Sequence, residues 1–158
     1  MKQERILVDE GLTLYIKEGD KVRKIVVKKP RSEWTFWDHL KALFRLQKGS
    51  LTTYGKNQAA QLFLGLTPAY SVDSIGAITT TGEEIWRGPT DTDRYYVGTG
   101  TVRIVNERNP FPGGKNYTKI RCRSSNYTAD YHNEISISLN LSGASNVSFW
   151  AEVRFVFS

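Results

Sequence analysis

Residues 134–157 read EISISLNLSGASNVSFWAEVRFVF, and this stretch decides the fold class. Apolar and polar residues alternate twice within it, first over residues 134–141 and then over residues 147–157. A period of two places one kind of side chain on each face of a strand, so both runs predict half-buried β-strands. Because the loop between them spans only residues 142–146, we expect the two strands to pair antiparallel.

Working outward, the chain between residue 68 and this stretch is punctuated by Gly, Thr, Ser and Asn and contains further short extended runs. We predict strands over residues 72–79, 84–87, 95–105 and 117–123. The segment 110–114, Pro-Phe-Pro-Gly-Gly, predicts an exposed loop. This number of half-buried antiparallel strands predicts a mainly β protein, either an antiparallel β-sandwich or a jelly-roll-like barrel.

One or two helices are expected over about residues 35–64. Thr35 and Asp38 form a pattern resembling a capping box, and Gly49 is placed to end the helix that follows. Its apolar face would consist of Phe36, Leu40, Leu43 and Phe44 with Gln47, next to Trp37. A second, shorter helix is predicted over residues 56–64. We expect the aromatic side chains of both helices to belong to the core.

The first 31 residues predict a β-hairpin. Leu12, Leu14 and Ile16 alternate with polar neighbours, residues 18–21 supply a turn, and residues 22–28 resume an extended run. A lone hairpin is marginally stable in water, so we expect this one to lie against something else. We therefore divide the chain into an N-terminal hairpin arm, residues 1–31, and a β-sandwich domain with the helices, residues 32–158.

The positive charge is concentrated near the N-terminus. The 158 residues contain 22 Lys and Arg against 16 Asp and Glu, a net charge of +6. Residues 1–48 hold 12 basic and seven acidic side chains, whereas residues 49–158 hold ten and nine. Most of the excess comes from Lys17, Lys21, Arg23, Lys24, Lys28, Lys29 and Arg31. Such a segment suits contact with nucleic acid, anionic lipid or an acidic neighbour, or it protects an edge strand from aggregation.

A second group of basic residues lies on one predicted strand. Lys119, Arg121 and Arg123 share one face of it, while Ile120 and Cys122 share the other. Three nearby tyrosines at positions 117, 127 and 131 interleave aromatic and basic groups. Such a surface can stack bases and hold phosphates, or it can form a protein interface. We favour the interface because the body of the chain is close to neutral.

The sequence offers no recognisable catalytic chemistry. A single cysteine, Cys122, excludes an internal disulfide and a cysteine-based zinc site, and it should point into the core. His132 lies between Asp130 and Glu134, yet the spacing matches no catalytic or metal-binding motif. We therefore expect a non-enzymatic protein without cofactor or metal. We see neither a signal peptide nor an apolar run long enough to span a membrane.

The stretch Tyr54-Gly-Lys-Asn-Gln-Ala-Ala-Gln-Leu-Phe-Leu-Gly65, the following Ser74-Ile-Gly-Ala-Ile78 and the closing strand over residues 147–155 resemble small virion structural proteins of phages and related viruses. The resemblance covers roughly residues 52–157 and leaves the N-terminal hairpin and first helix outside. It implies a coat, tail or decoration protein that builds a symmetric assembly.

The leading hypothesis is therefore a virion structural protein, assembled in the host cytoplasm, that forms homo-oligomers and contacts other virion proteins. Its expected contacts are aromatic anchors and the basic residues above; the anchors are Trp34, Trp37, Trp86 and Trp150. One alternative is a nucleic-acid-binding β protein that uses the hairpin arm and residues 119–123. A second is a carbohydrate-binding sandwich that presents Trp86 or Tyr95 to a sugar.

Overall fold

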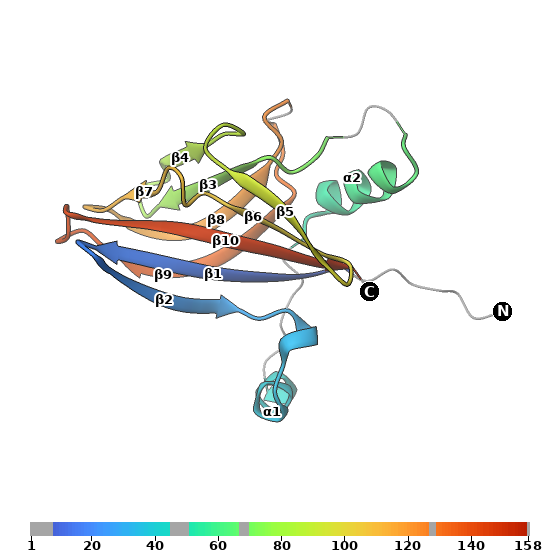
Figure 1. Cartoon of the computed structure of the whole chain (residues 1–158), viewed down its shortest axis with the longest axis horizontal. Coiled ribbons are helices and arrows are strands. Elements are labelled where there is room, and N and C mark those ends of the chain that lie inside the picture. Colours follow the sequence, from blue (N-terminus) through green and yellow to red (C-terminus); the bar gives the residue numbers. More distant parts are fainter. Residues whose placement is uncertain (1–7, 45–50, 67–69, 127–128, 158) are drawn as a thin grey trace.

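The computed structural model describes residues 8–44, 51–66, 70–126 and 129–157, with the backbone alone for 41–44. Two antiparallel sheets pack face to face, as the sequence predicts for a β-sandwich (Figure 1). In the first sheet the strand order is β2-β1-β10-β6-β5, with β7 on β10; in the second it is β4-β3-β8-β9. The strands are β1 (Val8–Glu18), β2 (Lys21–Lys28), β3 (Ser74–Thr79), β4 (Glu84–Arg87), β5 (Asp93–Gly98), β6 (Thr101–Val105), β7 (Phe111–Pro112), β8 (Asn116–Arg123), β9 (Asn133–Asn140) and β10 (Val147–Phe157).

The core lies between the inner faces of the two sheets. Alternate residues of β1 and β10 meet alternate residues of β3, β8 and β9 there, which is why the period-two pattern is so regular in these strands. Phe149 stands at its centre, with ring centroids 5.1 Å from Phe111 and 4.7 Å from Tyr117. Cys122 is fully buried, and burial raises the pKa of its thiol above the usual range, with a further contribution from the charge of Glu10.

The predicted N-terminal hairpin exists, but the division of the chain at residue 31 is wrong. β1 lies inside the first sheet and pairs with β10 from Val8↔Phe157 to Glu18↔Val147. Leu12, Leu14 and Ile16 belong to the core. The charge that suggested a separate arm is concentrated on β2 and the turn, whereas the alternation of β1 already belonged to the body.

The pairing predicted for the last two strands is also wrong. Both strands form, but β9 belongs to the second sheet and pairs with β8, whereas β10 pairs with β1, β6 and β7 in the first. Residues 141–146 therefore cross from one sheet to the other. Alternation shows which residues face inward, and two strands that face each other across the core have the same pattern as two neighbours in one sheet.

Two further segments differ from the prediction. Residues 95–105 form the hairpin β5–β6 rather than one strand, because Gly98, Thr99 and Gly100 all adopt positive φ angles and reverse the chain. The predicted exposed loop at residues 110–114 contains β7, and Phe111 is fully buried against Phe149. Its two prolines flank a side chain that completes the core.

Both helices are present, namely α1 (Phe36–Phe44) and α2 (Thr53–Phe63), together with a 3-10 turn (Arg31–Glu33). The cap before α1 is as predicted: the Thr35 backbone N–H donates to the Asp38 carboxylate at 2.8 Å. The predicted end of this helix lies outside the described residues. The expectation that the helical aromatics are buried is wrong for Phe36, Trp37 and Phe63, which are 71%, 68% and 77% exposed. α1 stands apart from both sheets (Figure 1), so neither sheet covers Phe36 and Trp37.

Candidate functional site

A cavity of about 630 Å³ lies between α2 and the inner faces of β5, β6 and β10, at one end of the sandwich. This volume falls within the range of about 300–1,000 Å³ that small-molecule sites occupy. Its wall is mostly apolar, and the apolar lining consists of Val8, Leu51, Gly55, Ala59, Leu62, Phe63, Val72, Val102, Ile104, Phe155 and Phe157. Ser71, Arg94, Tyr95, Tyr96, Arg103 and His132 complete the lining.

The start of α2 is fixed to the beginning of β9, which positions one wall of the cavity. The Thr52 backbone N–H donates to the His132 carbonyl at 2.9 Å, and the Thr52 hydroxyl donates to the Tyr131 carbonyl at 2.6 Å while accepting from the Gly55 N–H at 3.0 Å. A Cβ atom at Gly55 would overlap the His132 carbonyl oxygen. Glycine at this position therefore allows the helix to approach the strand closely.

Strand β5 supplies the opposite wall. Arg94 pairs with Ile104 and Tyr96 with Val102, and residues directly opposite in an antiparallel pair point to the same face. Because Ile104 belongs to the core and Val102 packs against it, Arg94 and Tyr96 project from the inner face of the sheet. Tyr95 and Arg103 project from the outer face, where the Arg103 guanidinium lies over the Tyr95 ring at 4.5 Å.

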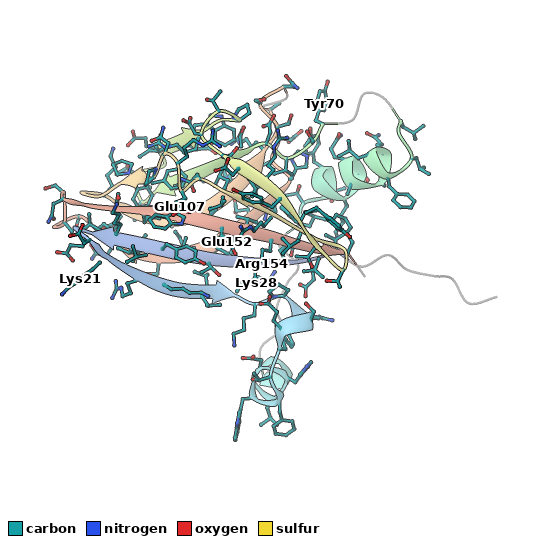
Figure 2. The ribbon with its side chains drawn as sticks, in the orientation of Figure 1. Lys21, Lys28, Tyr70, Glu107, Glu152 and Arg154 are labelled. Atoms are coloured by element: carbon teal, nitrogen blue, oxygen red, sulfur yellow. The ribbon has the colours of Figure 1, made fainter. Side chains whose placement is uncertain are left out.

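Arg94 differs from the other arginines of the neighbouring strands in its charge partners. Arg103 pairs with Glu152 at 3.2 Å, and Arg154 pairs with Glu33 and Glu152. Glu152 and Arg154 both belong to β10 (Figure 2). No carboxylate of the described residues lies within ion-pairing distance of Arg94. Arg94 is exposed at the mouth of the cavity, and among the described residues no carboxylate pairs with it.

The rim of the cavity exposes a group of large apolar side chains. Tyr96 is 74% exposed and Val97 58%, and the end of α2 adds Phe63 and Leu64. The full set is Leu62, Phe63, Leu64, Leu66, Tyr95, Tyr96, Val97 and Phe157, which we call the apolar rim. Five of these residues (Leu62, Phe63, Tyr95, Tyr96 and Phe157) also line the cavity. Groups of large exposed apolar side chains mark interaction sites on soluble proteins.

The two edge strands of the first sheet differ strongly in charge. β2 carries Lys21, Arg23, Lys24 and Lys28, and lysines on an edge discourage pairing with another chain. β5 carries one acidic and one basic residue, Asp93 and Arg94, and then presents Tyr95, Tyr96 and Val97. The β5 edge is therefore the less protected of the two.

The basic residues predicted on β8 do share one face of the strand, but two glutamates neutralise most of their charge. Arg121 Nε lies 2.6 Å from Glu134 and Arg123 Nη2 lies 2.6 Å from Glu84, while Lys119 reaches Glu134 at 3.3 Å. Burial alone would raise the pKa of Glu134, and the hydrogen bonds and charges of Arg121 and Lys119 outweigh burial and lower it. Three cations against two carboxylates leave a small positive excess, which argues against a phosphate-binding stripe.

The basic residues of the hairpin fall into two groups. Lys28 pairs with the buried Glu10 at 3.2 Å, Lys29 pairs with Asp38 at 3.4 Å, and the Arg31 guanidinium lies over the Trp34 ring. The remaining four, Lys17, Lys21, Arg23 and Lys24, are exposed. Figure 2 shows Lys21 at the turn of the hairpin, pointing away from the sandwich.

Of the four tryptophans predicted as anchors, Trp37 alone is largely exposed. Trp150 is buried and stacks on Tyr15 with centroids 5.3 Å apart. Trp86 packs over Gly76 beneath Arg123, and Trp34 donates its indole N–H to the Lys29 carbonyl. These three side chains are buried or half-buried and pack within their own chain.

His132 has a structural environment. Its side chain is buried, its Nε2 lies 2.8 Å from the Tyr70 carbonyl, and the Tyr54 ring packs edge-on against it. No hydrogen bond joins its ring to Asp130 or Glu134. Burial lowers the pKa of His132, and the Tyr70 carbonyl and the charge of Asp73 oppose this only in part. Within the described part of the chain, no three His, Cys, Asp or Glu side chains gather as metal ligands.

The lowered pKa of His132 predicts a loss of stability in mild acid. The unfolded chain takes up a proton on this histidine near pH 6.5 while the folded protein does not, so the free energy of unfolding should fall as the pH drops below about 6.5. One such proton contributes a slope of at most about 1.4 kcal/mol per pH unit. Urea unfolding between pH 7.5 and 5.5 measures it; an H132Q chain should show a shallower slope, and an unchanged slope would contradict the assignment.

Comparison of the chain with protein-family models, curated proteins and solved structures finds no match. Among the described residues, no helix is long and apolar enough to cross a membrane. The cavity and its rim were not predicted from the sequence, because they combine residues from both ends of the chain. The one local signal was the run Arg94-Tyr-Tyr-Val97, where neighbouring apolar residues break the alternation expected of a half-buried strand.

Proposed function

We propose that this chain is a non-catalytic structural subunit that self-assembles, as expected for a coat, tail or decoration protein of a virion. The observation that carries the proposal is the exposed apolar run Tyr95, Tyr96 and Val97 on edge strand β5, next to the exposed apolar residues at the end of α2. The resemblance of residues 52–157 to virion structural proteins agrees with it and supplies the expected location and partners.

The contact we propose is pairing of β5 with β5 of a second copy. The free side of β5 offers backbone N–H and C=O groups, and antiparallel pairing about a two-fold axis uses the same surface on both copies. Tyr95, Tyr96 and Val97 would then bury exposed apolar surface, which supplies the main driving force. The cations of β2 would keep the opposite edge of the sheet from pairing in the same way.

The test is a pair of matched Val-to-Lys variants at the two edges. Val97→Lys places a charge on the β5 edge, whereas Val22→Lys places one on the β2 edge, where the valine is 51% exposed. We expect V97K to raise the dissociation constant of self-association at least about tenfold, and V22K to leave it unchanged. Sedimentation velocity over a range of micromolar concentrations measures both.

Two results would contradict the proposal. One is a wild-type chain that stays monomeric at every concentration, including in the presence of candidate virion partners. The other is an equal loss of association in V97K and V22K, which would indicate a general effect of charge. Circular dichroism of both variants confirms that the comparison is made between folded proteins.

A further inference from the structure

We propose that the cavity between α2 and β5 binds an amphipathic anion, a long-chain carboxylate whose alkyl chain fills the cavity and whose head group pairs with Arg94 at the mouth. This inference is independent of self-association. It rests on three features of the cavity: its apolar walls, the absence of acidic residues among the lining residues of the described chain, and the Arg94 guanidinium on the inner face of the first sheet.

The walls are suited to an alkyl chain. Residues of the first sheet, of α2 and of the segments before β3 and β9 line the cavity, and Ile104, Phe155 and Val72 present aliphatic or aromatic carbon to it. The volume of about 630 Å³ leaves room for a chain of considerable length. Each methylene moved from water into such a site contributes about 0.8 kcal/mol, which corresponds to about a fourfold gain in affinity.

The charge of the lining selects an anion. No Asp or Glu is among the lining residues of the described chain, and the two charged residues there are Arg94 and Arg103. Arg103 is already paired with Glu152 on the outer face and stacked on Tyr95. Arg94 is thus the cation available to a ligand.

The position of Arg94 fits the head group. The register with Ile104 places this guanidinium on the inner face of the sheet, beside the apolar residues Val102 and Ile104 of β6. Arg94 is exposed and therefore accessible to a ligand, and a carboxylate accepts two parallel hydrogen bonds from a guanidinium. Tyr96, next but one along the same face, can cover the alkyl chain near the mouth.

The experiment titrates the full chain with octanoate, decanoate and dodecanoate below their micellar concentrations, by isothermal titration calorimetry. We expect one site per chain and about a fourfold tighter dissociation constant for each added methylene until the cavity is full. Dodecanol tests the contribution of the head group, and dodecyltrimethylammonium tests the sign of the charge. The cationic detergent should bind much more weakly than dodecanoate.

Variants separate the head-group site from the cavity. Arg94→Gln should weaken dodecanoate at least about tenfold and leave dodecanol unchanged, because only the charged pair is lost. Arg23→Gln, an exposed arginine on the opposite edge strand, is the matched control and should change neither. Ala59→Phe fills the cavity from α2 and should weaken both ligands.

Absence of dodecanoate binding to the wild-type chain would overturn the proposal. So would equal weakening by R94Q and R23Q, or uptake of many molecules per chain, which indicates non-specific detergent binding. Repeating the titration with V97K distinguishes the two proposals: one-to-one binding of dodecanoate by a variant that no longer self-associates would support the cavity site whether or not the chain assembles. Loss of dodecanoate binding in V97K while R94Q binds normally would contradict the cavity site and leave the assembly role of β5 standing.

Discussion

A chain that begins at Arg31 should not fold. This truncated chain lacks β1 and β2. In the full chain, β1 lies between β2 and β10 and contributes Leu12, Leu14 and Ile16 to the core. Loss of a buried Leu or Ile side chain costs about 2–5 kcal/mol, so three of them approach the whole free energy of unfolding of a domain, about 5–15 kcal/mol. The truncation also exposes the β10 edge along eleven paired positions.

Urea unfolding followed by tryptophan fluorescence and circular dichroism measures the effect, since all four tryptophans remain in the shortened chain. We expect no cooperative transition. The control is a full-length chain with Lys21, Arg23 and Lys24 changed to Gln, which keeps β1 and removes exposed charge; it should unfold cooperatively. A cooperative transition in the truncated chain would instead restore the hairpin as a separable arm.

Replacing Phe149 by Ala should lower the free energy of unfolding by about 3–5 kcal/mol. The side chain is fully buried between the rings of Phe111 and Tyr117, so its removal forfeits apolar burial and leaves a cavity that the two sheets cannot close. Tyr117 is also anchored by its hydroxyl, which donates to the Pro112 carbonyl at 2.7 Å, and this limits how far the ring can shift.

The matched control is Phe36→Ala, the same substitution on α1 where the ring is mostly exposed. It should change the free energy of unfolding by no more than about 0.5 kcal/mol. Urea titration of both variants against the wild type supplies the numbers. Similar losses for F149A and F36A would mean that α1 is packed against a surface, contrary to its position away from the sheets.

Several features of the fold follow from short stretches of the sequence alone. The period-two alternation of residues 134–141 and 147–157 correctly placed their inward residues in or against the core, apart from the exposed Phe157, and the Thr35–Asp38 cap was correct in its partners. The alternation of Leu12, Leu14 and Ile16 was likewise correctly assigned to a strand. Each of these features depends on residues only a few positions apart in the chain, so the local sequence is sufficient to predict it.

The candidate site was largely beyond such reasoning. Its cavity joins Val8, near one end of the chain, to Phe157 near the other, and α2 reaches it only through the contacts of Thr52 with His132. The basic face of β8 was correctly predicted, but its neutralisation was not, because Glu84 and Glu134 come from the two neighbouring strands.

The sequence by itself determined the fold class, most of the strands and their inward residues, and the uneven charge of this protein. The tertiary structure alone decided that β1 is an interior strand, that β9 and β10 lie in opposite sheets, and that Arg94 faces an apolar cavity. The physical reason is that side-chain alternation fixes the face of a strand but not its neighbours. Neighbours are chosen by packing and backbone pairing between segments that are far apart in the chain.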